Sequence, residues 1–282
     1  MTEGTMTIRE AVRRAAARFE QAGVPDAAYD AQLMLAHLLG EDRLRMRLDD
    51  MRTLDPAVQA AYEAMTARRE AREPLQYILG ETEFMGLTFH VEPGVLIPRF
   101  DTEILCEEAL RILGKRGGRV LDIGTGSGAL AVSIARLCPA AQVTAVDISP
   151  DALAIAERNA KANGVSVRFV RSDCFAALAG EKFDMIVSNP PYIPPHEMAE
   201  LMPEVRCEPE LALAGGEDGL VFYRRIAQEA PAYLNDGGAL LFEIGWQQRD
   251  DVCALLRAHI GEPYALRDCG GNWRVCAAIH SA

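Results

Sequence analysis

A rigid, proline-rich turn follows the apolar run FDMIV, which is expected to form a buried strand. The turn is SNPPYIPP, residues 188–195, and Asn-Pro sequences favour turn initiation. A residue before proline is pushed out of the α region and each proline fixes φ, so the backbone from Asn189 to Tyr192 is nearly rigid. Pro190 and Pro191 have no N–H, which leaves their carbonyls as acceptors. Residues 189–192, called the bracket from here on, can therefore hold a planar amino group.

Methylation of an amide or an aryl amine is a reaction that such a bracket suits. The nitrogen lone pair of these groups is delocalised, so a site must localise it before the nitrogen can act as a nucleophile. We predict that the Asn189 side-chain oxygen and the Pro190 carbonyl accept the two N–H protons, while Pro191 and Tyr192 complete the substrate contacts, Tyr192 by stacking. Orientation and preorganised acceptors then suffice, without a covalent intermediate or a metal.

A glycine-rich loop, DIGTGSGA, is the second candidate and joins a predicted strand to a predicted helix. Glycine allows positive φ and lets a ligand approach the backbone closely. Asp147 ends the next predicted strand, about where an acid reaches the two hydroxyls of a ribose. These features indicate an adenosine-containing cofactor, held by Asp147 and by the loop residues Gly124, Thr125, Gly126, Ser127 and Gly128.

The glycines alone do not decide which cofactor binds, because GTGSGA also fits the GxGxxG/A pattern of NAD sites. Asp122 precedes the first glycine by two residues, where a carboxylate would repel a pyrophosphate and attract an ammonium group. S-adenosylmethionine carries an ammonium and a sulfonium and no phosphate. We therefore expect S-adenosylmethionine, with NAD, or a glycine turn without a ligand, as the alternatives.

Further cofactor contacts are expected at the same edge, because open α/β sheets bind ligands outside the carboxyl ends of their strands. Asp173 ends the segment VRFVRSD and is expected to hydrogen-bond the adenine amino group. Cys174 and Phe175 would then form walls beside the ring, and Asn189 would also border the cofactor. The competing interpretation of Asp173 is an N-cap at the start of a following helix.

The segments that must position these residues alternate between strand and helix. Predicted strands cover residues 119–124, 142–147, 167–173, 183–188 and 238–245. This alternation predicts an α/β fold, with a mainly parallel, Rossmann-like sheet and helices on both faces. The C-terminal segments YALRDC and RVCAAIH are expected to close the sheet as a hairpin.

The N-terminal part of the chain has helical periodicity and short loops instead. Apolar residues recur at helical spacing from Ile8, a second segment covers 31–39, and Asp55-Pro56 marks the start of a third. β-forming residues in 83–97 predict a hairpin. We therefore expect a small helical bundle at 1–75, a linker with a β-hairpin at 76–103 and the cofactor-binding domain at 104–282.

Composition and charge exclude several classes of protein. The net charge is −12, from 29 basic and 41 acidic residues, so a long-range field would repel phosphate backbones. Apolar runs are all shorter than the ~20 residues of a membrane span and the N-terminus lacks the core of a signal peptide, so we expect a cytoplasmic protein without membrane contact. The seven cysteines are widely spaced, so we expect no disulfide framework, no metal site and mostly buried thiols.

The motifs DIGTGSG, AVD and SNPPY, in this order, resemble those of the class I S-adenosylmethionine-dependent methyltransferases, among which NPPY marks members that act on planar nitrogens. Three further segments resemble the release-factor glutamine methyltransferases, the PrmC/HemK family: PLQYILGETEFMGLTFHVEPGVLIPRFDTE, EPELALAGGEDGL and RDCGGNWRV. The likeness covers essentially the whole chain. It implies methylation of the side-chain amide nitrogen (N5) of the glutamine in the GGQ motif of class I peptide chain release factors, with S-adenosylhomocysteine as product.

Two residues depart from the pattern of that family. Phe100 stands where a second proline usually follows IPR, and we expect it in the wall of the acceptor pocket. Cys174 stands at a position that is often aromatic, which weakens its assignment beside adenine. The roles of Arg99 and Glu243 stay open. Arg99 follows the predicted hairpin and Glu243 lies near the end of the fifth predicted strand, so both could face the cleft.

Two other functions compete with this interpretation. A DNA or rRNA amino-methyltransferase would use the same NPPY motif, but the net charge of −12 and the lack of a basic stripe count against a direct nucleic-acid target. A noncatalytic protein that binds release factors would have no need of the bracket. The helical bundle would supply the remote contacts that distinguish one protein substrate from another.

Overall fold

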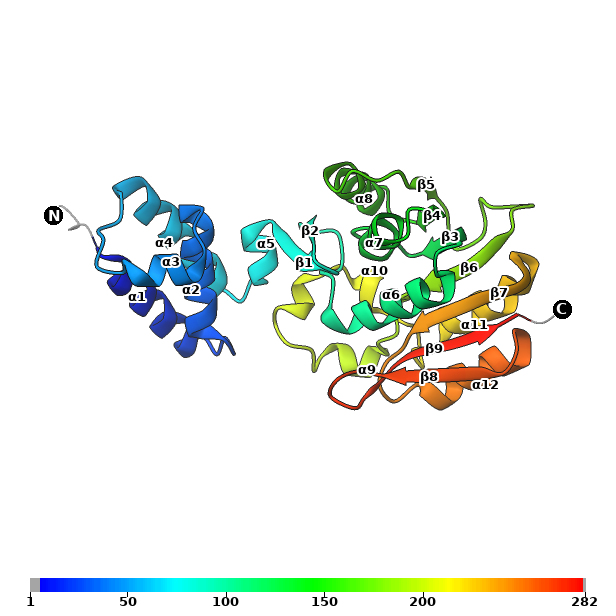
Figure 1. The fold of residues 1–282 in the computed structure, drawn as a ribbon. Coiled ribbons are helices and arrows are strands. Elements are labelled where there is room, and N and C mark those ends of the chain that lie inside the picture. Colours follow the sequence, from blue (N-terminus) through cyan, green and yellow to red (C-terminus); the bar gives the residue numbers. More distant parts are fainter. Residues whose placement is uncertain (1–5, 281–282) are drawn as a thin grey trace. The chain divides into compact units, whose positions relative to one another are not determined.

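The computed structural model describes residues 6–280, which fold into two compact units (Figure 1). The first unit lies within Met1–Gly80 and also includes the distant segment Met202–Cys207. The second is formed by Glu81–Leu201 and Glu208–Ala282. The chain thus leaves the second unit once, after the proline-rich turn, to place a short segment in the first.

The first unit is helical, as the sequence predicts. Its helices are α1 (Ile8–Gln21), α2 (Ala27–Leu39), α3 (Arg43–Leu48), α4 (Pro56–Glu70) and α5 (Leu75–Leu79). Asp55 accepts a hydrogen bond from the N–H of Ala57 and Pro56 occupies the first turn of α4, which confirms the predicted start of that helix. The short helices α3 and α5 carry too few residues to show a periodic pattern, and sequence reasoning missed them.

A β-hairpin begins the second unit. Its strands β1 (Glu81–Phe84) and β2 (Leu87–His90) pair antiparallel around a turn in which Met85 and Gly86 both have positive φ. This confirms the predicted hairpin, although Pro93-Gly94 lies beyond it. Phe84 and Phe89 are buried, and their rings meet edge to face with centroids 6.0 Å apart. Both rings belong to the core of the second unit, so the hairpin is part of that unit.

A seven-stranded sheet forms the centre of the second unit, in the order β5-β4-β3-β6-β7-β9-β8 (Figure 1). The first five strands in this order are parallel, and β9 and β8 add an antiparallel edge that confirms the predicted C-terminal hairpin. The strands are β3 (Gly118–Ile123), β4 (Ala141–Asp147), β5 (Arg168–Arg171), β6 (Phe183–Ser188), β7 (Leu234–Glu243), β8 (Pro263–Arg267) and β9 (Trp273–Ile279).

Successive side chains along each strand point to opposite faces of the sheet. Both faces carry buried apolar side chains, and helices cover both of them. Val120 faces a core shared with α6 (Phe100–Leu113), α7 (Ala129–Leu137) and α8 (Pro150–Ala162). Its neighbour Leu121 faces a second core, shared with α11 (Val221–Glu229) and α12 (Arg249–His259). The remaining short helices are α9 (Pro195–Met198), α10 (Glu210–Leu213) and the 3-10 turns Val205–Cys207 and Ala230–Ala232. This is the predicted Rossmann-like α/β architecture.

Residues 6–280 contain neither a candidate membrane span nor a candidate metal cluster. In that part of the chain none of the helices has both the length and the apolar character that a bilayer requires. Groups of three or more His, Cys, Asp or Glu residues placed to hold a metal are likewise absent from it. Five of the seven cysteines are buried and all are free thiols, so their predicted role as small core residues is confirmed for most of them.

Candidate functional site

The strand order reverses between β3 and β6, and this switch point brings the two sequence motifs together. Ile123 pairs with Ser188 in the parallel register, and the Ser188 hydroxyl donates to the Ile123 carbonyl at 2.7 Å. Each strand ends at that pair, so Gly124 of the glycine loop and Asn189 of the proline turn leave the sheet side by side. In an open α/β sheet this is where a crevice forms.

Glycine is needed at the three positions of the loop for different structural reasons. All have positive φ, at +74° for Gly124, +55° for Gly126 and +83° for Gly128. A Cβ added at Gly124 or Gly126 would meet no atom within 4 Å, so the backbone there is open to a ligand. A Cβ at Gly128 would lie 3.0 Å from the Cβ of Ala156, so this glycine lets α7 pack closely on α8.

Asp147 and Asp122 both support the glycine loop. Asp147 accepts from the N–H of Gly126 and from the N–H of Ser149, both at 2.9 Å. Asp122 is only 1% exposed, accepts a 2.6 Å hydrogen bond from the Thr125 hydroxyl, and has a second oxygen without a hydrogen-bond partner. Burial raises the pKa of Asp122 to about 7, against the Thr125 hydrogen bond. Asp122 thus lies beneath the loop, and a direct contact with a ligand ammonium is closed to it.

The residues after β5 differ in part from expectation. The segment 173–177 forms turns, and the hydroxyl of Ser172 accepts from Ala177 N, so the competing N-cap interpretation of Asp173 is wrong. The Asp173 carboxylate pairs with Arg225 at 2.6 Å, a partner 52 residues away that sequence reasoning missed. Cys174 is 7% exposed with φ of +48°, and burial raises its pKa to about 11.

The expectation that Phe175 forms a wall beside the adenine ring is wrong. It is fully buried and stacks on Tyr233 with centroids 4.4 Å apart, so it is a core residue and presents no surface to a ligand. Trp246, just after β7, is 57% exposed and lies outside the core. Phe100, the first residue of α6, is 79% exposed and buries little against the protein itself.

The proline turn is held from several sides. Pro190 is buried, and the Tyr192 carbonyl accepts from the side chain of Gln248 at 3.1 Å. Gly215 and Gly219 press on the same residue, since an added Cβ would come within 2.5 Å of Tyr192 Cα and 2.4 Å of its carbonyl oxygen respectively. Gln248 and these two glycines are supporting residues that sequence reasoning missed, although both glycines lie in the segment EPELALAGGEDGL that carries the family resemblance.

The exit of the turn and the linker are also tied down. Ile193 exchanges backbone hydrogen bonds with residues 213 and 215, at 2.9 Å each. Arg99 pairs with Glu208, whose carboxylate also accepts from the N–H of Ile97 at 3.0 Å. Burial raises the pKa of Glu208, which Arg99 opposes. The segment that begins with Glu208 therefore packs on the residues just before α6.

Asn189 contacts the start of α6. Its Nδ2 donates to the Thr102 hydroxyl at 3.4 Å, while its Oδ1 accepts from none of residues 6–280. Glu243, the last residue of β7, is 2% exposed, and burial raises its pKa to about 7. The predicted acceptor oxygen of Asn189 therefore has no hydrogen-bond partner within residues 6–280.

The site fits S-adenosylmethionine. Open space lies above the backbone of Gly124 and Gly126, and the carboxyl groups of Asp122 and Asp147 both hydrogen-bond to residues of the loop. An ammonium and a sulfonium are favoured near such negative charge, whereas a pyrophosphate is not. Methyl transfer then needs only an oriented acceptor beside the loop, where Asn189 lies.

Comparison with known proteins gives matches along most of the chain. The model of the PrmC N-terminal domain matches residues 10–80, and that of the methyltransferase small domain matches residues 88–205. The release factor glutamine methyltransferase of Geobacter sulfurreducens is 45% identical over 271 residues, which is 95% of each chain. That of Bordetella pertussis is 46% identical over 249 residues, covering 87% of this chain and 92% of the relative.

Solved structures are similar at lower identity. A methyltransferase from Pyrococcus furiosus matches with a TM-score of 0.55 and 21% identity over 81% of this chain and all of its own. The 16S rRNA N2 G1207 methyltransferase RsmC of T. thermophilus, solved with AdoMet and guanosine, matches with a TM-score of 0.54 and 24% identity, over 71% of this chain and 49% of its own. At these identities the structures support the fold alone.

Proposed function

This chain belongs to the release factor glutamine methyltransferase family, and we propose that its substrate is the glutamine of the GGQ motif in class I peptide chain release factors. It is an S-adenosylmethionine-dependent methyltransferase, and S-adenosylhomocysteine is its product. The observation that supports the proposal is the pairing of Ile123 with Ser188, which brings Gly124 and Asn189 side by side. A nucleic-acid amino-methyltransferase is not favoured, because the curated relatives named above act on release factors.

The reaction joins the amide nitrogen to the methyl carbon while the bond from that carbon to sulfur breaks and its electron pair stays on sulfur. The nitrogen then loses one proton to water. Asn189 Oδ1 and the Pro190 carbonyl accept the two amide N–H groups, which turns the nitrogen lone pair toward the methyl group. Tyr192 and Pro191 cover the planar amide. Rigid acceptors lower the barrier because they need no reorganisation during the reaction. Phe100, with its exposed side chain, would cover the substrate from the side of α6.

The cofactor would contact the exposed backbone of the glycine loop. The Asp147 carboxylate already accepts a hydrogen bond from Gly126 N, and it keeps further lone pairs that can accept hydrogen bonds from ribose hydroxyls. Asp173 and Cys174 would border the adenine, with Arg225 holding the Asp173 carboxylate in place. The contacts proposed for the loop are those of Gly124, Thr125, Gly126, Ser127 and Gly128, with Asn189 at its edge.

The helical part of the chain, predicted at 1–75, is proposed to recognise the release factor. Leu44, Leu48 and Met51 on and after α3 are 69%, 81% and 63% exposed. Next to them, a cavity of about 410 Å³ is lined by both apolar and charged side chains of α1, α2 and α3. Exposed apolar groups of this kind mark protein-contact surfaces.

Incubation with labelled S-adenosylmethionine and purified release factor tests the function. DNA and rRNA serve as parallel acceptors, and mass mapping locates the label. We expect label on the glutamine of GGQ in class I release factors and none on nucleic acid. Label on nucleic acid alone, or on another residue of the release factor, would contradict the proposal.

A further inference from the structure

The proposed reaction requires the side-chain amide of Asn189 to face one way. Only Oδ1 can accept a hydrogen bond from the substrate amide N–H, whereas Nδ2 carries two donor hydrogens. The two ends of this amide have nearly the same shape, so packing alone does not select between them. A hydrogen-bonding neighbour must do so.

Thr102 is that neighbour. Asn189 Nδ2 donates to its hydroxyl at 3.4 Å, and Thr102 is only 5% exposed, so water does not compete for the contact. A hydroxyl, however, can donate or accept. Thr102 therefore selects the amide orientation only if its own proton is committed elsewhere.

Glu243 can take that proton. Ser188 pairs with Phe242 in the register of β6 and β7, so Asn189 and Glu243 come next on neighbouring strands. Glu243 is 2% exposed, and its Oε2 has no hydrogen-bond partner among residues 6–280. The nearby Thr102 hydroxyl favours the ionised form of Glu243, against the larger effect of burial, which raises its pKa. An ionised carboxylate only accepts, so the Thr102 proton points to Glu243 and the Thr102 lone pairs point to Asn189.

We propose that Thr102 and Glu243 are positioning residues that orient the Asn189 amide, with Nδ2 held by Thr102 and Oδ1 left for the substrate. The proposal rests on the proposed function, since it assigns a reason for the orientation that methylation needs. It also explains why the first turn of α6 packs against the end of β6. Neither residue touches the reacting atoms.

The protonation state of Glu243 then controls the orientation. A neutral carboxyl can donate to Thr102, whose own proton would turn to Asn189 and favour the flipped amide. Burial raises the pKa of Glu243 to about 7, so turnover should fall as the pH drops below about 7. The charged and titratable groups that act on this carboxyl are Arg99 and Asp101 before and in α6, Arg274 on β9, Tyr192 after β6 and Tyr223 on α11.

Substitutions at the two positions test the proposal. Thr102→Val removes the hydroxyl at nearly constant shape, Thr102→Ser keeps it, and Glu243→Gln replaces an acceptor with a possible donor. We expect kcat on release factor to fall about a hundredfold in the Val and Gln variants, because a misplaced acceptor costs about that much. The Ser variant should stay within about threefold of wild type, with the calorimetric Kd for S-adenosylhomocysteine unchanged in all three.

Two controls separate positioning from loss of structure. Ser133→Ala deletes another buried hydroxyl, one without a hydrogen-bond partner, and Glu108→Gln alters another buried carboxyl, which Arg111 and Tyr264 hold. Both should keep the wild-type kcat. The acid limb of the kcat profile near pH 7 should disappear in Glu243→Gln and persist in Glu108→Gln. Equal kcat in the Val and Ser variants, or an unchanged acid limb in Glu243→Gln, would overturn the proposal.

An orientation measurement keeps the test independent of the substrate. Nuclear Overhauser contacts between the Asn189 Nδ2 protons and Thr102 should be strong in the wild type and lost in Glu243→Gln. If the wild-type enzyme labels no release factor, the proposed function is contradicted. The nuclear Overhauser contact between Asn189 and Thr102 would still show which way the Asn189 amide faces. Contacts that are the same in both proteins would refute the positioning roles.

Discussion

Asn189 shows how one side chain can combine a local and a long-range requirement. Its rigid backbone comes from the two prolines that follow, whereas its amide is held by Thr102, 87 residues away. Gly215 and Gly219 act in a similar way, because they are needed where distant backbone comes against Tyr192. By contrast, Gly124 and Gly126 are needed for the open space above them.

Replacement of Asn189 with alanine should remove the substrate acceptor and spare the cofactor. We expect the activation free energy of methyl transfer to rise by about 3 kcal/mol, the typical effect of losing one preorganised hydrogen-bonding group. Single-turnover kinetics measure the rate, and calorimetry with S-adenosylhomocysteine measures cofactor affinity. Asn235→Ala, at an asparagine that bonds Asp184 away from the turn, is the control. Wild-type turnover in Asn189→Ala would rule out the proposed bracket.

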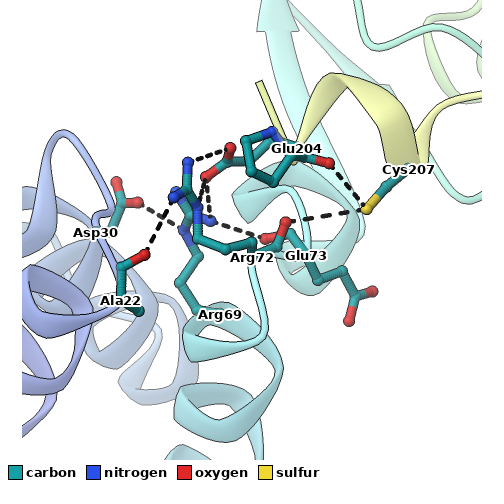
Figure 2. A network of polar contacts seen from close by, with 8 residues as sticks. Ala22, Asp30, Arg69, Arg72, Glu73, Glu204 and Cys207 are labelled. Carbon is teal, nitrogen blue, oxygen red and sulfur yellow. Dashed lines mark hydrogen bonds and ion pairs between the residues drawn. The ribbon is translucent and has the colours of Figure 1, made fainter. Parts of the chain in front are cut away.

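At the scale of elements, the segment Met202–Cys207 is the clearest long-range feature (Figure 2). Glu204 receives hydrogen bonds from Arg72 at 2.7 Å and from Arg69 at 2.9 Å, and Arg69 also donates to Asp30 at 2.8 Å. Figure 2 shows these side chains converging between α4 and the segment. Arg69 is almost fully buried, so both of its carboxylate partners are needed to compensate its charge.

Glu204→Gln should therefore destabilise the helical unit. Burial acts to raise the pKa of Glu204, but hydrogen bonds from Arg72 and Arg69 outweigh it and lower the pKa from 4.5 to about 2. Such a shift corresponds to about 3 kcal/mol of stability, present above pH ~4.5 and lost as the pH falls toward 2. Urea titrations followed by circular dichroism should show this loss at pH 7.

The exposed Glu217 provides the matched control for that experiment. Glu217→Gln should leave the free energy of unfolding within about 0.5 kcal/mol of wild type. The difference between Glu204→Gln and wild type should shrink as the pH is lowered from 4.5 toward 2, because the wild-type carboxylate becomes protonated. A constant difference across that range would show that the charge of Glu204 is not what stabilises the unit.

At the scale of the whole molecule, a methyltransferase sheet and a helical unit are combined in one chain. The glutamine side chain alone offers few contacts, so remote binding energy is needed for discrimination among proteins. The net charge of −12 makes a long-range attraction to nucleic acid unfavourable, so apolar contacts are the better candidate for recognition. The exposed residues on and after α3 are the proposed sites of such contacts.

The double substitution Leu48→Ser and Met51→Ser should weaken recognition of the intact release factor. We expect at least a tenfold increase in KM for that substrate, which corresponds to about 1.4 kcal/mol of lost binding. KM for a short GGQ peptide should stay unchanged, because the peptide lacks the parts of the release factor that the helical unit is proposed to bind. Leu137→Ser, at a 45% exposed leucine of α7, is the control. Equal effects on both substrates would contradict the recognition role.

The sequence by itself determined most elements of the fold and the centre of the site. Hydrophobic alternation, proline and glycine act over a few residues, so the strands, the hairpins, the glycine loop and the NPPY turn could be predicted where they occur. The same rules place Asp147 and Asn189 at strand ends. Short helices such as α3 and α5 escaped because their patterns are too brief.

Only the tertiary structure decided which distant side chains meet. Arg225 with Asp173, Glu204 with Arg69, and Asn189 with Thr102 come from elements far apart in sequence, and charge or polarity at one position does not name its partner. The sequence did not determine which aromatic side chains are buried either. Phe175 lies in the core, whereas Trp246 is exposed. The physical reason is that pairing and burial depend on how helices pack on both faces of the sheet, which local sequence patterns do not specify.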